Sequence, residues 1–146
     1  MTASPIEVEE NTKYIGYDLV GAEDRGRPLR DFLKELLEFR DKCNKEVLDI
    51  LFLFHAGETL DTGSSTDQNL FDAVLLNSKH IGHGFSLPKH PEAMRLVKER
   101  GIALEICPIS NEVLGLCSTV RGHTLPILLA NNVPCTVNSD NGTFYR

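Results

Sequence analysis

Hydrophobic and polar positions switch repeatedly between two periods along the chain, which predicts strands and helices in strict succession. Short apolar runs typical of strands occur at 14–20, 47–54, 79–84, 102–109 and 134–140. The run at 47–54 is nearly all apolar, as expected of a strand buried on both faces of a parallel sheet. Between the runs, apolar residues at steps of three and four predict helices over 29–37, 65–75, 91–100 and 123–132. The segment from Ser65 to Gln68 matches a capping box, which would begin the second helix.

Five strands joined by four helices predict an α/β fold with a parallel sheet and right-handed crossovers. An open doubly wound sheet and part of a (β/α)8 TIM barrel both satisfy this order. No G-x-G-x-x-G follows the first strand and no phosphate-binding loop is present, which disfavours the nucleotide-binding open sheets. We therefore predict a partial barrel domain over 14–146, preceded by a solvated lead-in over 1–13.

Charge and composition disfavour some classes of binding partner. The 146 residues include 15 basic and 21 acidic side chains, a formal net charge of −6. No basic stripe is present, so the sequence predicts neither a nucleic-acid surface nor attachment to a membrane. No apolar run has the length of a membrane span, and the acidic N-terminus does not resemble a secretory signal. The four cysteines form no C-x-x-C pair, and we expect them to be free thiols.

Polar or glycine-bearing clusters follow every predicted strand. Parallel strands of a barrel bring their carboxyl ends to one face, where catalytic loops collect. We therefore expect the clusters to form a single site at that face. They lie at 18–24, 55–58, 82–84, 107–111 and 139–141.

The cluster at 55–58 offers the clearest chemistry. His55 follows an apolar run, so its imidazole would lie at the rim of a dry core, where it could bind zinc. Gly57 would let the chain turn, so that Glu58 points over the same face. A carboxyl in partly apolar surroundings has a raised pKa and can act as a general acid. The alternative is that His55 only ends a strand and that Glu58 is solvated.

Two further strand ends carry candidate residues. His83 lies between two glycines and could orient or deprotonate a metal-bound water, although a turn histidine is the more common explanation. Asp140 ends an apolar strand and could be a metal ligand or a hydrogen-bond acceptor, or could simply begin a turn with Asn141. The remaining histidines are expected to be structural or exposed, or to lie where helices begin: His80, His90 and His123.

These motifs, taken in order, resemble the adenosine deaminase family. The similar segments are 55–58 (HAGE), 81–84 (IGHG), 107–111 (CPISN) and 139–140 (SD). The segments at 18–24 and 82–91 are closer to the extracellular branch of adenosine-deaminase-related growth factors. The resemblance covers 14–140 and corresponds to the C-terminal half of the family's barrel.

The resemblance implies a (β/α)8 barrel with one catalytic zinc that hydrolyses adenosine to inosine and ammonia. His55 and Asp140 would be zinc ligands, while Glu58 would protonate the purine ring and His83 would help to activate the attacking water. For the substrate, Gly21 would contact the purine through its backbone, and Asn141 would occupy a purine-binding position. The partner implied is a small nucleoside, and the branch implies an extracellular location, whereas the absence of a signal would otherwise indicate the cytoplasm.

The sequence also departs from the family's pattern. Two further zinc ligands normally come from a His-x-His segment, which is absent here, and Asn141 replaces an aspartate that binds the purine. In addition, Ala22 replaces a histidine that is common in the growth-factor branch. Five strands cannot close an eight-stranded barrel. We therefore keep two alternatives to an active deaminase: an inactive relative that binds a nucleoside or a partner protein, and an incomplete chain without a stable fold.

Overall fold

The computed structural model describes residues 15–141, in which five strands form one parallel sheet with the order β1-β2-β3-β4-β5. The strands are β1 (Ile15–Tyr17), β2 (Ile50–Ala56), β3 (His80–His83), β4 (Ala103–Ile106) and β5 (Cys135–Val137). Sequence order and spatial order coincide, as in a barrel wall, because each crossover moves one strand along the sheet. The predicted parallel sheet is therefore confirmed. The predicted lead-in at 1–13 lies outside the described residues.

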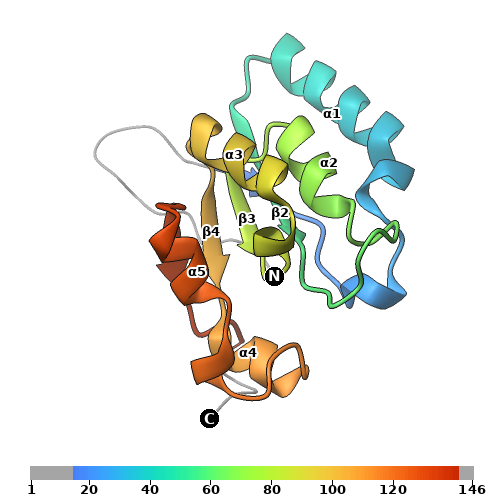
Figure 1. The fold of residues 1–146 in the computed structure, drawn as a ribbon. Coiled ribbons are helices and arrows are strands. Elements are labelled where there is room, and N and C mark those ends of the chain that lie inside the picture. The colour runs from blue at the N-terminus through green and yellow to red at the C-terminus, as the bar shows by residue number, and fades with distance from the viewer. Residues whose placement is uncertain (1–14, 142–146) are drawn as a thin grey trace.

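Helices fill the crossovers and pack on the sheet. The four predicted helices correspond to α1 (Leu33–Lys45), α2 (Asn69–Leu75), α3 (Pro91–Arg100) and α5 (Leu125–Ala130). A further short helix, α4 (Pro108–Val113), follows β4. Figure 1 shows α4 beyond the carboxyl ends of the strands, away from the helices that lie along the sheet. Short 3-10 turns lie at Glu23–Arg25, Leu29–Phe32, Leu87–Lys89 and Val120–Gly122.

Three details of the predicted elements are wrong. The strand at 102–109 ends at Ile106, because Pro108 fits the first turn of α4 and the Asn111 N–H bonds back to the Cys107 carbonyl. The capping box at 65–68 does not form. Instead, Ser64 Oγ accepts the Asp67 N–H at 3.1 Å, and α2 begins only at Asn69.

The third correction concerns β2, which is not buried on both faces. Its side chains alternate, with Phe52, Phe54 and Ala56 fully buried under the helices and the intervening residues only half-buried. The half-buried side chains lie on the concave face of the sheet, which is the inner face of a barrel wall. His55 belongs to this second face, which places it toward the barrel interior rather than in the helix-covered core.

The apolar core lies between the sheet and the helices. Residues of β2, β3 and β4 meet residues of α2 and α3 there, and most of them are completely buried. The four cysteines are free thiols as predicted, three of them buried. Among the helices of residues 15–141, none is long and apolar enough to cross a membrane.

Substitution of Leu104, in the middle of β4, tests how much this core contributes to stability. Its side chain is fully buried, and replacing it with alanine should lower the free energy of unfolding by about 2–5 kcal/mol because a cavity remains. Leu75→Ala in α2 is the matched control, since that leucine is 68% exposed and its truncation should cost within about 0.5 kcal/mol. Urea unfolding followed by circular dichroism measures both. Equal losses in the two variants, or the absence of a cooperative transition in the parent chain, would contradict the packing described.

Candidate active site

The carboxyl ends of β2 and β3 bring two histidines together. His55 is paired in register with Gly82, and Ala56 with His83. The rings of His55 and His83 lie 5.2 Å apart between centroids. A Cβ atom at Gly82 would lie 3.0 Å from the His55 ring, a tight contact. The absence of a side chain at Gly82 thus leaves room for the His55 imidazole beside the neighbouring strand.

Asp18 orients His55 from the loop after β1. The Asp18 carboxylate accepts the His55 backbone N–H at 3.1 Å, and its other oxygen lies 2.7 Å from Nδ1. That second contact is an ion pair when the ring is protonated. Burial would lower the pKa of His55, but Asp18, with help from Glu58 and Asp140, more than offsets it and raises that pKa. The Nε2 side of the ring remains for another partner.

Glu23 holds the turn that follows His55. Its carboxylate accepts the backbone N–H groups of Gly57 at 3.0 Å and Glu58 at 2.6 Å, together with the Asn69 amide at 2.9 Å. Burial raises the pKa of Glu23 in spite of these three donors. Gly57 has a φ of +77° and no room for a Cβ, which would lie 2.9 Å from Leu70. The turn that aims Glu58 is therefore fixed both by sterics and by a half-buried carboxylate.

Glu58 points toward His83 and Asn111. Its Oε1 atom lies 2.9 Å from His83 Nδ1 and accepts the Asn111 side-chain N–H at 3.2 Å. The His83 side chain is 3% exposed and that of Glu58 12%. His83 has a φ of 63°, a left-handed conformation that is costly for a residue with a side chain. Behind Asn111 lies His123, whose Nε2 is 2.9 Å from the amide oxygen.

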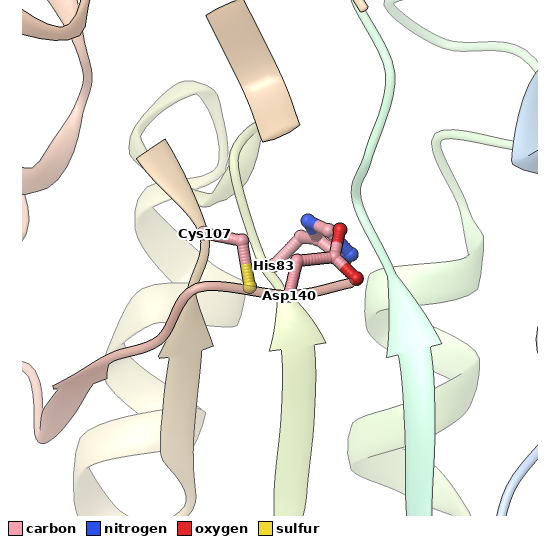
Figure 2. A group of neighbouring side chains, drawn as sticks. All are labelled: His83, Cys107 and Asp140. Atoms are coloured by element: carbon pink, nitrogen blue, oxygen red, sulfur yellow. The ribbon is translucent and has the colours of Figure 1, made fainter. Parts of the chain in front are cut away.

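Asp140, beyond β5, lies close to His83 and Cys107. One ligand-capable atom from each residue lies within 4.8 Å of the others, and Figure 2 shows the three side chains at adjacent strand ends. Burial, with the carboxylates of Asp140, Glu58 and Glu105, raises the pKa of the Cys107 thiol to about 12. Such an excess of nearby negative charge disfavours a thiolate and would favour a cation. Nitrogen, sulfur and oxygen donors of this kind suit a divalent metal such as zinc.

Gly21 lies in a pocket of about 200 Å³ that also reaches His55 and Glu58. This volume is below the range of about 300–1,000 Å³ that is usual for ligand sites. Asn141 follows Asp140 and is half-buried. Five of the six predicted site residues thus lie around the ends of β2, β3 and β5: His55, Glu58, His83, Asp140 and Asn141. The sixth, Gly21, lines the pocket.

Sequence reasoning assigned no individual role to the residues that hold these side chains. Asp18, Glu23 and Asn111 lie within the polar clusters noted at the strand ends, so the clusters were a usable signal. His123 was expected only to begin a helix. Its ring does accept the Leu125 N–H at 2.9 Å, but it also contacts Asn111. Spacing along the sequence does not predict which of these distant side chains form hydrogen bonds with one another.

The Glu23 contact predicts a local change in hydrogen exchange. In Glu23→Gln, a side-chain NH₂ replaces one acceptor and must face a backbone N–H donor. The amides of Gly57 and Glu58 should then exchange at least about tenfold faster, since a hydrogen bond to a charged group contributes about 1.5–3 kcal/mol. Asp24→Asn, an exposed neighbour in the same loop, is the control. Amide exchange followed by NMR reports both residues, and unchanged protection in Glu23→Gln would mean that the carboxylate does not hold the turn.

Several solved structures share this fold. The fold is similar to that of an adenine deaminase from Arthrobacter aurescens, with a TM-score of 0.72 and 24% identity over 89% of this chain and 36% of that one. It is also similar to ADAL from Arabidopsis in complex with IMP, with a TM-score of 0.70 and 22% identity over 90% of this chain and 34% of that one. At these identities the likeness establishes the fold alone. The predicted partial (β/α)8 barrel is confirmed.

Sequence comparisons establish the family. The chain is 48% identical to an adenosine deaminase of Aedes albopictus over 90% of its own length and 23% of that protein's. It is 40% identical to human adenosine deaminase 2 over 98% of its length and 27% of that protein's. The chain therefore spans about a quarter of these relatives. The family model for adenosine deaminase matches residues 8–146, and the chain belongs to the adenosine deaminase family.

Proposed function

We propose that this chain supplies the acid–base part of the active site of a zinc-dependent adenosine deaminase, which converts adenosine to inosine by hydrolysis. The observation that carries the proposal is the pair of Glu58, which is half-buried, and His83, which is buried; their Oε1 and Nδ1 atoms lie 2.9 Å apart beside His55. Hydrolytic removal of an amino group from a purine needs one group that protonates the ring and another that deprotonates water. These two side chains supply both groups at one barrel mouth.

Zinc would be held by His55 and Asp140, with the family's remaining two ligands coming from a His-x-His segment of the barrel that this chain does not span. Asp18 beside His55 Nδ1 supports this assignment, because metal-binding histidines are commonly oriented by a carboxylate on their other ring nitrogen. Among the three donors that lie within 4.8 Å of one another, we assign only Asp140 to the metal, because His83 is the proposed proton acceptor. When bound, zinc supplies a Lewis acid that lowers the pKa of water to about 7.

The chain's own residues would then divide the proton transfers. Glu58 would carry a proton toward the purine ring, which makes the attacked carbon more electrophilic. His83, on the adjacent strand, would take a proton from the attacking water. Gly21, at the rim of the pocket that also reaches Glu58, would contact the purine through its backbone, and Asn141 would occupy the neighbouring polar position.

Glu58→Gln tests this assignment. The enzyme used is the chain extended at its N-terminus by the family's barrel segment that carries His-x-His, and loaded with zinc. Loss of the acid should lower kcat for adenosine by about 10²–10⁴-fold, measured by the absorbance change on conversion to inosine.

Two controls accompany this measurement. Glu38→Gln on α1, whose side chain is 68% exposed, should retain the parent rate. His55→Ala should lose bound zinc, measured by metal analysis. Equal rates in Glu58→Gln and Glu38→Gln, or a zinc content that does not change in His55→Ala, would sink the roles proposed here.

A second candidate is an inactive relative that binds a nucleoside. It is favoured by Asn141, which stands where the family has a purine-binding aspartate, and by the pocket lined by Gly21, His55 and Glu58, which needs no metal to exist. An uncharged amide could bind a purine edge without supporting catalysis.

Nucleoside binding without zinc separates this candidate from the enzyme. Inosine added to the metal-free chain at 100 times its dissociation constant should stabilise the fold by about 2.7 kcal/mol. Calorimetric titration measures the binding, and thermal unfolding measures the stabilisation. Adenosine and a purine-free ribose serve as comparison ligands. The absence of both heat and stabilisation with either nucleoside would eliminate this candidate.

A further inference from the structure

Asp67 and His90 form a side-chain pair outside the candidate active site. His90 Nε2 lies 2.7 Å from Asp67 Oδ1, and the Asp67 side chain is completely buried while that of His90 is 13% exposed. An ionised carboxylate can only accept, so the His90 ring donates to it. The other carboxylate oxygen accepts the Gly63 N–H at 2.7 Å, and the Asp67 N–H donates to Ser64 Oγ at 3.1 Å. Asp67 thus closes the loop 59–67 on itself and ties it to the start of α3.

The His90 ring serves this loop rather than its own helix. His90 directly precedes α3, and its backbone begins the helix, since the Met94 N–H donates to the His90 carbonyl at 2.9 Å. The ring makes no hydrogen bond that caps α3. It packs edge-on against Phe71 instead, with 5.5 Å between ring centroids, and reaches Asp67. A histidine that the sequence placed only at a helix start therefore joins two separate segments.

These two segments lead away from the proposed acid and the proposed base. Residues 57–67 follow β2 and carry the acid, whereas residues 84–90 follow β3, which ends at the base. Beside the acid, the Ser86 N–H donates to the Gly57 carbonyl at 2.9 Å. The Asp67–His90 pair joins the same segments at their far ends. The segments are therefore tied once at the active site and once at a distance from it.

A weaker contact lies between these two points. Lys89 Nζ donates to the Leu60 carbonyl at 2.7 Å, and both residues are exposed. A hydrogen bond within reach of water gains little over the bond to water that it replaces. Loss of a donor to the fully buried Asp67 carboxylate, in contrast, leaves a buried charge short of a partner. We therefore expect the Asp67–His90 pair, rather than Lys89, to hold the two segments together.

We infer that Asp67 and His90 are positioning residues for Glu58 and His83. By joining the segments that follow β2 and β3, they help to keep the Oε1–Nδ1 separation of 2.9 Å between the acid and the base. They act through the backbone of these segments and not at the reacting atoms. The effect on catalysis rests on the proposed deaminase function, whereas the coupling between the two segments does not.

Amide hydrogen exchange in the full chain, followed by NMR, tests this coupling without enzyme activity. His90→Leu keeps an apolar contact with Phe71 but removes the donor to Asp67. The amides of Gly63 and Ser86 should then both exchange at least about fivefold faster, since one buried hydrogen bond contributes on this scale. His90→Gln, which keeps a side-chain N–H near the position of Nε2, should restore both rates. Faster exchange at Gly63 alone would overturn the inference, because the pair would then hold only its own loop.

Lys89→Met is the matched control, since it removes the exposed contact beside His90. It should leave the exchange of the Ser86 amide within about twofold of the parent rate. If Lys89→Met accelerated this exchange as much as His90→Leu does, the inference would be wrong. Asp67→Asn gives the same test should His90→Leu not fold, because an amide oxygen and nitrogen cannot accept from two donors. Parent rates at Gly63 and Ser86 in Asp67→Asn would contradict the role of the pair.

The zinc-loaded extended enzyme tests the effect on catalysis. His90→Leu should lower kcat about tenfold and leave KM within about twofold of the parent, because a displaced reacting group slows the chemical step more than it weakens binding. His90→Gln should recover the parent kcat. An unchanged kcat in His90→Leu, or a fall that His90→Gln does not reverse, would overturn the inference. Retention of activity in Glu58→Gln overturns the proposed function instead, and the exchange rates still decide whether the segments are coupled.

Discussion

The Glu23 carboxylate is the contact on which the arrangement of this site depends. It reaches from the loop after β1 to the backbone of Gly57 and Glu58 after β2, and to Asn69 at the start of α2. The loop after β1, the turn after β2 and the start of α2 thereby share one half-buried acceptor. Without it, two backbone N–H groups would lack partners in the middle of the turn, and the direction of Glu58 would be set only by the torsion of Gly57. The carboxylate supplies this direction at an energetic cost, because burial raises its pKa.

Negative charge accumulates around the imidazoles and the thiol of the barrel mouth. Asp18, Glu58 and Asp140 all act on His55 and raise its pKa, and Asp140 and Glu58 also raise that of Cys107. These carboxylates favour the cationic form of His55, whereas the metal binding that we propose for it uses the neutral ring. The same field favours a divalent ion strongly once one enters. This excess of carboxylates is therefore compatible with the metal site that we propose.

Patterns in the sequence predicted more of the fold than of the site. Apolar runs and helical spacing predicted the parallel sheet and its crossovers, because burial of a strand or a helix face leaves a period in the sequence. The end of β4 was misjudged, since Ile109 extends the apolar run but belongs to a helix that Pro108 can begin. The positions of His55 and Glu58 at a strand end followed from parallel topology. The bonds of Glu23 and of Asn111 could not be predicted, because they join residues 34 and 53 positions apart, and spacing along a chain carries no information about such pairs.

The two parts of the site are held by forces of different kinds. Glu58 and His83 are fixed by buried hydrogen bonds that run through Asn111 to His123 and the backbone of α5. Asp140 follows β5, whose Val137 is 65% exposed, and β5 is tied to β4 by strand pairing and by the Asn138 N–H on the Ile106 carbonyl at 2.8 Å. A buried network resists small displacements in every direction, whereas an exposed strand end is restrained mainly by its pairing. Glu58 and His83 are thus organised in advance by the protein, while Asp140, the proposed metal ligand, retains freedom to adjust. A metal ion bound to Asp140 and His55 would remove that freedom by joining the ends of β5 and β2, which are not neighbours in the sheet.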